Sequence, residues 1–307
     1  MLLQITHETR YVYSPAVETA QHLAHLKPLD TPTQALLEHR LEISPEPAQR
    51  TESADGYGNA RAFFALESTH EELSVVAHSV VRTSPPMQPG AAARAVPWEQ
   101  VRERFRYRKG ASYDAAADFV FPSRYAPRHD DFADYARASF APGRPLFDAA
   151  HELNLRMFSD FIYDGDSTEV STPAVQALAQ RRGVCQDFAH IMIACLRTMG
   201  LPARYVSGYL LTQPAPGQER LLGADASHAW VSVYLPGAEG TGDWTDFDPT
   251  NGRQPGEDYV TLATGRDFAD VSPIRGVLHG GARHRLKVGV TVQPIEPSAN
   301  DAQGPDG

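Results

Sequence analysis

The sequence contains little cysteine: Cys185 and Cys195 are the only two in 307 residues. Two thiols in one short segment cannot build a disulfide framework or a four-thiolate zinc site. Unpaired cysteines are typical of a reducing compartment, so we expect a cytoplasmic protein. Residues 1–10 also lack the basic start and apolar run of a signal peptide, which agrees with that expectation.

Long apolar runs and excess positive charge are also missing. No stretch of ~18 apolar residues occurs, so no membrane-spanning helix is expected. The net charge of −10 and the pI near 5.6 disfavour nucleic acid or a membrane surface as the main partner. With 42% hydrophobic and 21% charged residues, the chain can bury the core of one large or two moderate domains.

Several common catalytic motifs are absent. The chain has neither the Gly-x-x-x-x-Gly-Lys loop that holds phosphates nor the Gly-x-Ser-x-Gly turn of many serine hydrolases. His70-Glu71 and His151-Glu152 begin like a zinc-protease helix motif, but Ser74 and Leu155 stand where the second histidine is required. We therefore predict no metal and no organic cofactor.

The chain does contain a cysteine, a histidine and an aspartate in three short motifs. These are Gly183-Val184-Cys185, His228-Ala229-Trp230-Val231 and Asp248-Pro249-Thr250. A thiol is mostly protonated at neutral pH, so it needs a neighbouring imidazole to become a nucleophile. The imidazole in turn needs a carboxylate that holds its tautomer and orientation. Together the three residue types predict acyl transfer by a thiol.

Cys185 is predicted to begin a helix. The residues after it show helical spacing of apolar side chains, and Gly200 followed by Leu201-Pro202 ends the pattern. The apolar positions are Phe188, Ile191, Met192, Cys195, Leu196 and Met199. Unpaired N–H groups and the macrodipole of a helix start favour a thiolate at Cys185. Cys185 also extends the apolar stripe, so an ordinary buried cysteine is the alternative interpretation, which we accept for Cys195.

His228 opens a segment with the alternation of a β-strand. His228, Trp230, Ser232 and Tyr234 face one way, and Ala229, Val231, Val233 and Leu235 form the core face. Residues 204–211 and 244–247 predict neighbouring strands of an antiparallel sheet packed on the cysteine helix. Asp248-Pro249 ends the third strand, because proline cannot donate to the ladder. Such a sheet places His228 at one end of its strand, facing the start of the cysteine helix.

Two further carboxylates leave the orienting role open. Asp246 shares a strand face with Asp248 and could hold the imidazole instead. Asp187 lies in the first helical turn and is interpreted as a structural or dipole-complementing carboxylate. For the oxyanion of the reaction we expect the backbone N–H of Cys185, with the Gln186 side chain as a weaker alternative.

The three motifs resemble those of the transglutaminase-like branch of the papain-type cysteine enzymes. That resemblance implies an α+β fold in which a helix carrying the cysteine packs on an antiparallel sheet. Matching by position, it makes Cys185 the nucleophile, His228 the general base and acid, and Asp248 the orienting carboxylate. Residues 3–13, 55–59 and 266–273 are similar to bacterial members that carry a family-specific N-terminal β domain.

The resemblance is specific for the superfamily and says little about the reaction. Its members include cross-linking transferases, peptidases, amidases, peptide deglycosylases and proteins without catalysis. We expect hydrolysis of a peptide or amide through a thioester, because no extended calcium-binding apparatus is recognisable. Transfer of an amine to protein glutamine is the alternative within enzymes, and a catalytically silent binding module with the same fold is the other. The sequence does not indicate the oligomeric state.

Composition also predicts the domain organisation. Residues 1–83 form an N-terminal β-rich domain, and the proline- and alanine-rich residues 84–97 form a linker. Residues 98–296 form the transglutaminase-like catalytic domain, whose last strand can return to the N-terminal domain. Residues 297–307 form a polar, disordered tail. Helical patterns cover 98–107, 130–140 and 146–161.

Overall fold

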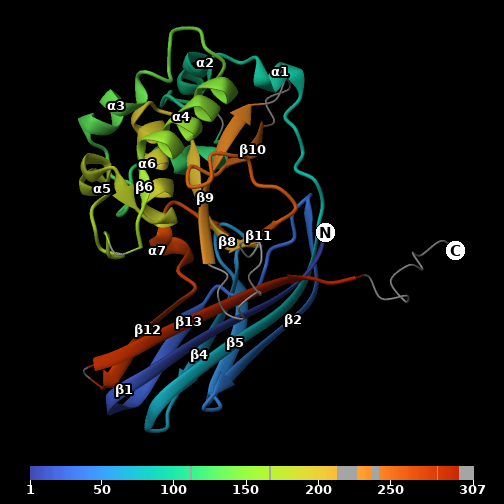
Figure 1. The fold of residues 1–307 in the computed structure, drawn as a ribbon, viewed down its shortest axis with the longest axis vertical. Helices are drawn as coiled ribbons and strands as arrows, with labels where there is room; N and C mark the ends of the chain where they lie inside the picture. Colours follow the sequence, from blue (N-terminus) through green and yellow to red (C-terminus); the bar gives the residue numbers. More distant parts are fainter. Residues whose placement is uncertain (111–112, 166, 213–226, 237–241, 282, 297–307) are drawn as a thin grey trace, which may run out of the picture.

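The structure is a computed structural model that describes residues 1–110, 113–165, 167–212, 227–236, 242–281 and 283–296. The predicted tail at 297–307 lies outside the described residues. A long twisted sheet occupies one end of the molecule, and helices packed on a smaller sheet occupy the other (Figure 1). This arrangement confirms the α+β fold class.

The larger sheet has seven strands in the order β2-β5-β1-β4-β3, and β12 and β13 also pair with β1. Their bounds are β1 Leu2–Ala24, β2 Gln34–Ser44, β3 Gln49–Ala54, β4 Ala60–Leu66, β5 His70–Thr83, β12 Ile274–Gly280 and β13 Arg283–Pro294. In Figure 1 the two red C-terminal strands lie along the blue β1. The two ends of the described chain therefore meet in one sheet, with Leu3 opposite Pro294.

Strand β1 is longer than the alternation of residues 2–13 predicts. It pairs with β5 and β13 over its first part and with β4 and β12 over its second part. The register with β5 shifts between Val12 and Val17. Pro15, inside this interval, has no N–H to donate to the ladder, so regular pairing is interrupted there and resumes beyond it.

The other end of the molecule contains the remaining elements. They are α1 Ala91–Arg94, α2 Trp98–Arg104, η1 Ala115–Val120, α3 Asp130–Ala136, α4 Leu146–Asp160, β6 Ile162–Tyr163, α5 Ala174–Gln180, β7 Arg182–Gly183, α6 Cys185–Thr198, β8 Ala203–Leu210, β9 Ser227–Pro236, β10 Gly242–Phe247, β11 Tyr259–Gly265 and α7 Phe268–Val271. Helix α1 lies inside the segment 84–97 that composition predicts as a linker. Helix α6 begins at Cys185 and ends before Gly200, as its pattern predicts.

The smaller sheet has the order β10-β9-β8-β11. One of its faces packs on α6 through Ala229, Val231 and Val233, which join the main hydrophobic core. The opposite face is covered as well, because Trp230 packs there with Val206 and Tyr259. The alternation along β9 therefore gives the correct core face, but both faces of the strand are buried. Strand β11 is not expected from the sequence pattern.

Buried polar contacts join the two sheets. Nδ1 of His7 on β1 lies 2.9 Å from the hydroxyl of Tyr209 on β8. The side chain of Asn59 bonds both the N–H and the carbonyl of Thr264 on β11, each at 2.7 Å. Because unpaired polar groups are costly when buried, these contacts hold the smaller sheet in a defined position.

Candidate active site

Cys185 occupies the first position of α6, directly after the short strand β7. The Asp187 carboxylate accepts hydrogen bonds from the Val184 N–H at 2.9 Å and from the Thr168 hydroxyl at 2.6 Å. It therefore caps the helix that carries the thiol. A Cβ at Gly183 would lie 2.6 Å from that carboxylate, so the glycine of the cysteine motif is required for this close approach.

His228 and Asp248 form a buried pair. His228 Nε2 donates to Asp248 Oδ2 at 2.7 Å, and the two residues are 7% and 0% exposed. The same oxygen accepts from Asn251 Nδ2 and from the Tyr259 hydroxyl, each at 2.7 Å. The other oxygen accepts the backbone N–H of Thr250 at 2.8 Å. Burial alone would raise the pKa of Asp248, but the hydrogen bonds led by that of His228 lower it.

The imidazole of His228 also interacts with the thiol. Nε2 is engaged by Asp248, which leaves Nδ1 for Cys185. Burial alone would lower the pKa of His228, but hydrogen bonds to Asp248 and Cys185 and their negative charges raise it to about 10. An imidazole with this pKa is protonated at neutral pH and places a positive charge beside the Cys185 side chain.

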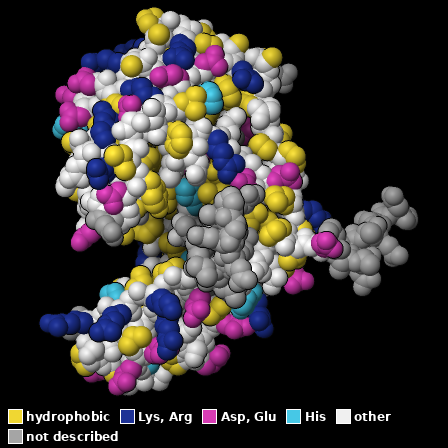
Figure 2. All heavy atoms as spheres, viewed as in Figure 1, with side chains coloured by type: hydrophobic (Ala, Val, Ile, Leu, Met, Phe, Trp, Pro, Cys, Tyr) yellow, Lys and Arg dark blue, Asp and Glu magenta, His cyan; other side chains and the backbone are white. Residues whose placement is uncertain are grey.

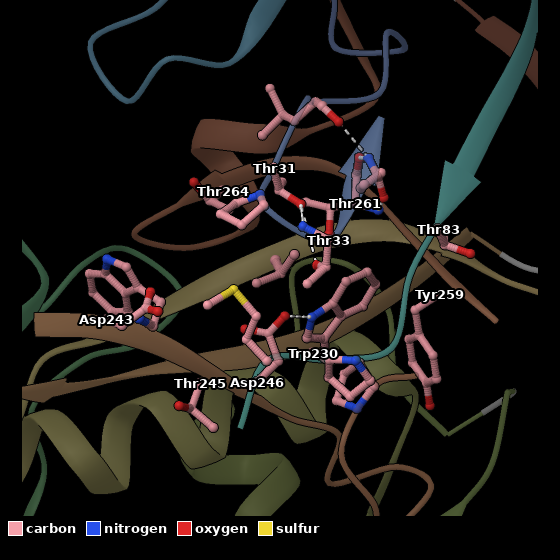
Figure 3. Close-up of a pocket in the computed structure, with 18 of the residues that line it drawn as sticks. Thr31, Thr33, Thr83, Trp230, Asp243, Thr245, Asp246, Tyr259, Thr261 and Thr264 are labelled. Atoms are coloured by element: carbon pink, nitrogen blue, oxygen red, sulfur yellow. Dashed lines mark hydrogen bonds between the residues drawn. The ribbon is translucent and has the colours of Figure 1, made fainter. Parts of the chain in front are cut away.

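Asp246, the other candidate for orienting the imidazole, has different partners. It accepts the indole N–H of Trp230 at 2.9 Å (Figure 3) and also the hydroxyl of Ser232. The Trp230 ring stacks on His228 with centroids 6.2 Å apart. Asp248 thus contacts the imidazole directly, while Asp246 holds the indole behind it. Burial raises the pKa of Asp246.

Around Cys185 the structure brings together residues that the motifs do not include. Strand β6 pairs in parallel with β7, so that Tyr163 lies opposite Gly183. Burial and the negative charge of Cys185 raise the pKa of the Tyr163 hydroxyl. The Gln186 side chain donates to the carbonyl of Val170 at 3.4 Å, away from the oxyanion role considered for it. The Cys185 N–H is the first of α6, before the helical hydrogen bonds begin; these start with Asp187, whose N–H donates to the Val184 carbonyl at 2.9 Å.

A cavity of about 510 Å³ lies behind Trp230 and Tyr259, on the side away from His228. Its walls come from the loop 29–34 of the larger sheet and from the outer face of β8 to β11. Trp230, Asp246 and Tyr259 line it together with a row of threonines (Figure 3). Within the part of the chain that the structure describes, no group of three or more metal-ligating side chains occurs. In the same residues no helix has the length and apolar character needed to cross a membrane.

Comparisons with known proteins match both parts of the chain. The model of the bacterial transglutaminase-like N-terminal region matches residues 3–82, and that of the transglutaminase-like superfamily matches residues 133–249. The chain belongs to the bacterial transglutaminase-like family, which confirms the resemblance seen in the motifs.

Individual relatives match nearly the full length of this chain. An uncharacterised protein of Mycobacterium tuberculosis is 39% identical over 300 residues, which cover 96% of this chain and 94% of that protein. One of Mycobacterium leprae is 30% identical over 296 residues, which cover 94% and 98%. A candidate cysteine protease from Cytophaga hutchinsonii has the same fold, with a TM-score of 0.73 at 22% identity over 97% of this chain and 92% of that one.

Proposed function

We propose that Cys185, His228 and Asp248 are a catalytic triad that hydrolyses a peptide or amide bond through a thioester. The position of His228 supports this proposal most strongly. Its ring is buried, bonded to Asp248 at 2.7 Å, and has its pKa raised to about 10 by Asp248 and Cys185. Ordinary surface histidines titrate near 6.5, so a shift of this size is typical of a site built for chemistry.

The reaction follows from these positions. The Cys185 thiolate attacks the amide carbon, and the carbonyl oxygen becomes negatively charged. As the C–N bond breaks, the His228 imidazolium gives its proton to the leaving amine, and a thioester remains on Cys185. The neutral imidazole then takes a proton from water, the resulting hydroxide attacks the thioester, and the C–S bond breaks to release a carboxylic acid. Asp248 keeps the ring oriented and stabilises its protonated form.

Oxyanion stabilisation is assigned to the start of α6. The N–H of Cys185 belongs to the first turn, where donors lack intrahelical acceptors and the dipole favours negative charge. The Gln186 side chain takes no part in this role, since it donates to Val170.

Hydrolysis is favoured over amine transfer, because the aromatic residues of the smaller sheet make contacts away from the thioester. A transferase must keep water away from the thioester, for which a cover of aromatic side chains is suited. Four aromatic residues near the motifs are used elsewhere: Trp230 bonds Asp246, Tyr209 bonds His7, Trp244 lies under Arg204, and Tyr234 packs against Phe105. A candidate cysteine protease with the same fold also agrees with hydrolysis. Both cysteines are free thiols, which suits a cytoplasmic location.

A peptide library incubated with the protein and a tagged primary amine tests the function. We expect new peptide carboxylates, their loss in Cys185→Ala, and their retention in the matched control Cys195→Ala. Tag incorporation that exceeds hydrolysis and depends on Cys185 would replace the proposal with amine transfer. Equal product formation by wild type and Cys185→Ala, or no product at all, would favour the silent module.

A further inference from the structure

Three large apolar side chains beside the triad are more than half exposed. Phe158 is 53% exposed, Tyr163 58% and Val170 54%. They come from the end of α4, from β6 and from the segment before α5. In the space-filling view, hydrophobic side chains gather over the region of α5 and β6 (Figure 2). We call these three residues the apolar rim. Large apolar side chains exposed together commonly mark a place where something binds.

Each residue of the rim lies against a chain segment that carries Cys185 or Asp248. Tyr163 lies opposite Gly183 in the β6–β7 pair, and Gly183 is two residues before Cys185. The Val170 carbonyl accepts the side chain of Gln186, the neighbour of Cys185.

Phe158 approaches from the other motif. A Cβ added at Gly252 would lie 2.7 Å from the Phe158 ring, so the ring rests directly on that glycine. Gly252 follows Asn251, whose side chain bonds Asp248 at 2.7 Å. The rim therefore has contacts with the cysteine segment and with the turn that follows the aspartate.

The backbone beneath the rim is held in place. The N–H groups of Ile162 and Asp164 donate to the carbonyls of Arg181 and Gly183, each at 2.9 Å. Thr168, two residues before Val170, donates to Asp187 at 2.6 Å. A surface fixed in this way loses little conformational entropy when a ligand covers it, which favours binding.

The size and charge of the rim indicate what it binds. Protein interfaces usually take about 20–30 residues on each side, whereas three side chains match a single substrate side chain. When an apolar side chain packs on such an aromatic and aliphatic surface, apolar area is removed from water, which stabilises the complex. Asp164, which follows Tyr163, is paired with Arg182 at 3.3 Å. The carboxylate of Glu169, which precedes Val170 in the chain, would repel a negatively charged substrate side chain.

We propose that the apolar rim binds an aromatic or large aliphatic side chain of the peptide or amide substrate, next to the bond that Cys185 attacks. The substrates are thus acyl compounds whose residue beside the reacting carbonyl is apolar. This proposal rests on the proposed function, because it assigns specificity to the same site.

The test uses p-nitrophenyl esters of N-acetyl-phenylalanine, N-acetyl-glycine and N-acetyl-aspartate with the intact protein. Thiolate attack forms the Cys185 thioester and releases p-nitrophenolate, which is followed by absorbance. Relative to the uncatalysed rates, we expect acylation by the phenylalanine ester to exceed that by the glycine ester by ~10-fold or more, the scale of a hydrophobic pocket. The aspartate ester should be slowest.

Phe158→Ser and Val170→Ser should each lower the phenylalanine-to-glycine ratio by ~3-fold or more. Leu286→Ser is the matched control, since Leu286 is 52% exposed on β13 of the larger sheet. That variant should keep the wild-type ratio. Circular dichroism and thermal unfolding establish that each variant is folded.

The outcomes separate the two proposals. If no ester acylates Cys185, the proposed function fails and the specificity fails with it. If all three esters react equally, or if both rim variants keep the wild-type ratio, the specificity alone is wrong. Size-exclusion chromatography tests the alternative that a second copy of this chain covers the rim. A wild-type dimer that Val170→Ser converts to monomer would make the rim an interface between copies of this chain.

Discussion

The hydroxyl of Tyr259 donates to the same oxygen of Asp248 that holds His228, and both bonds are 2.7 Å long. Tyr259 comes from β11, so the carboxylate is fixed by a strand on the far edge of the sheet as well as by its own turn. Its ring also packs edge-on against Trp230 at 5.4 Å. The orientation of the imidazole therefore depends on two layers of contacts behind it.

Removing this hydroxyl should weaken the triad without breaking the fold. Tyr259→Phe deletes one hydrogen bond to a charged group, so we expect kcat to fall about tenfold. The carboxylate then has one donor fewer and attracts the imidazolium more strongly, so the alkaline limb of the pH–rate profile should move to higher pH. Tyr209→Phe is the control, because Tyr209 is also buried but bonds His7. An equal loss in both variants would show a general packing effect.

Substitution of the two neighbouring aspartates should lower kcat/KM by different amounts. Asp248→Asn leaves a neutral partner for His228 and should reduce kcat/KM by roughly two to four orders of magnitude. Asp246→Asn disturbs Trp230 and Ser232, which contact the imidazole only through the Trp230 ring. Its effect on kcat/KM should be at least tenfold smaller. Steady-state kinetics with the reverse order would assign the orienting role to Asp246.

The two cysteines should react differently with alkylating agents. Cys195 is fully buried, and burial raises the pKa of its thiol to about 12. Cys185 is partly exposed at the helix start beside a protonated imidazole. Iodoacetamide at pH 6 followed by peptide mass mapping should therefore label Cys185 at least 100-fold faster. Preferential labelling of Cys195, or of neither, contradicts a reactive thiolate.

Acid should destabilise the fold through buried histidines. Burial lowers the pKa of His7 and of His22 to about 4, with His70 adding to the shift at His22. The unfolded chain binds a proton at each near pH 6.5, so their contribution is fully present above that pH. It is lost as the pH falls to 4, by up to about 3 kcal/mol for each histidine. The raised pKa of His228 adds no slope here, since His228 is protonated in both states below its unfolded value.

Urea unfolding at several pH values between 7.5 and 4 measures that loss. His22→Leu should reduce the slope of unfolding free energy against pH, because neither ring nitrogen of His22 has a hydrogen-bond partner. A variant with the wild-type slope would mean that His22 titrates normally in the folded protein.

The sequence predicts the parts of the site that have a local signal. Apolar spacing and Gly200 define the helix that begins at Cys185, and alternation defines the strand of His228. Asp246 and Asp248 cannot be separated in this way, because residues two apart share one face of a strand. The structure distinguishes them because β10 ends at Phe247 and Asp248 enters a turn, where the N–H of Thr250 bonds its carboxylate.

Residues that reach the site from distant elements have no such signal. Tyr259 follows Asp248 by eleven positions on a strand that the pattern does not reveal, and its role depends on the pairing of β11 with β8. Tyr163 reaches Cys185 through a two-residue strand whose pairing with β7 is nonlocal. Pairings of this kind depend on the tertiary fold, and one sequence does not encode them as a local pattern.

In the proposed reaction, water hydrolyses a thioester on Cys185. Rapid acid quenching of the reaction with N-acetyl-phenylalanine p-nitrophenyl ester in ¹⁸O-labelled water, followed by mass spectrometry of protein and product, tests it directly. We predict the acyl mass on the peptide containing Cys185 and one ¹⁸O atom in the released N-acetyl-phenylalanine, with neither above the uncatalysed level in Cys185→Ala. Enzymatic product formation by Cys185→Ala at the wild-type rate, with no adduct on the wild-type cysteine, would contradict it.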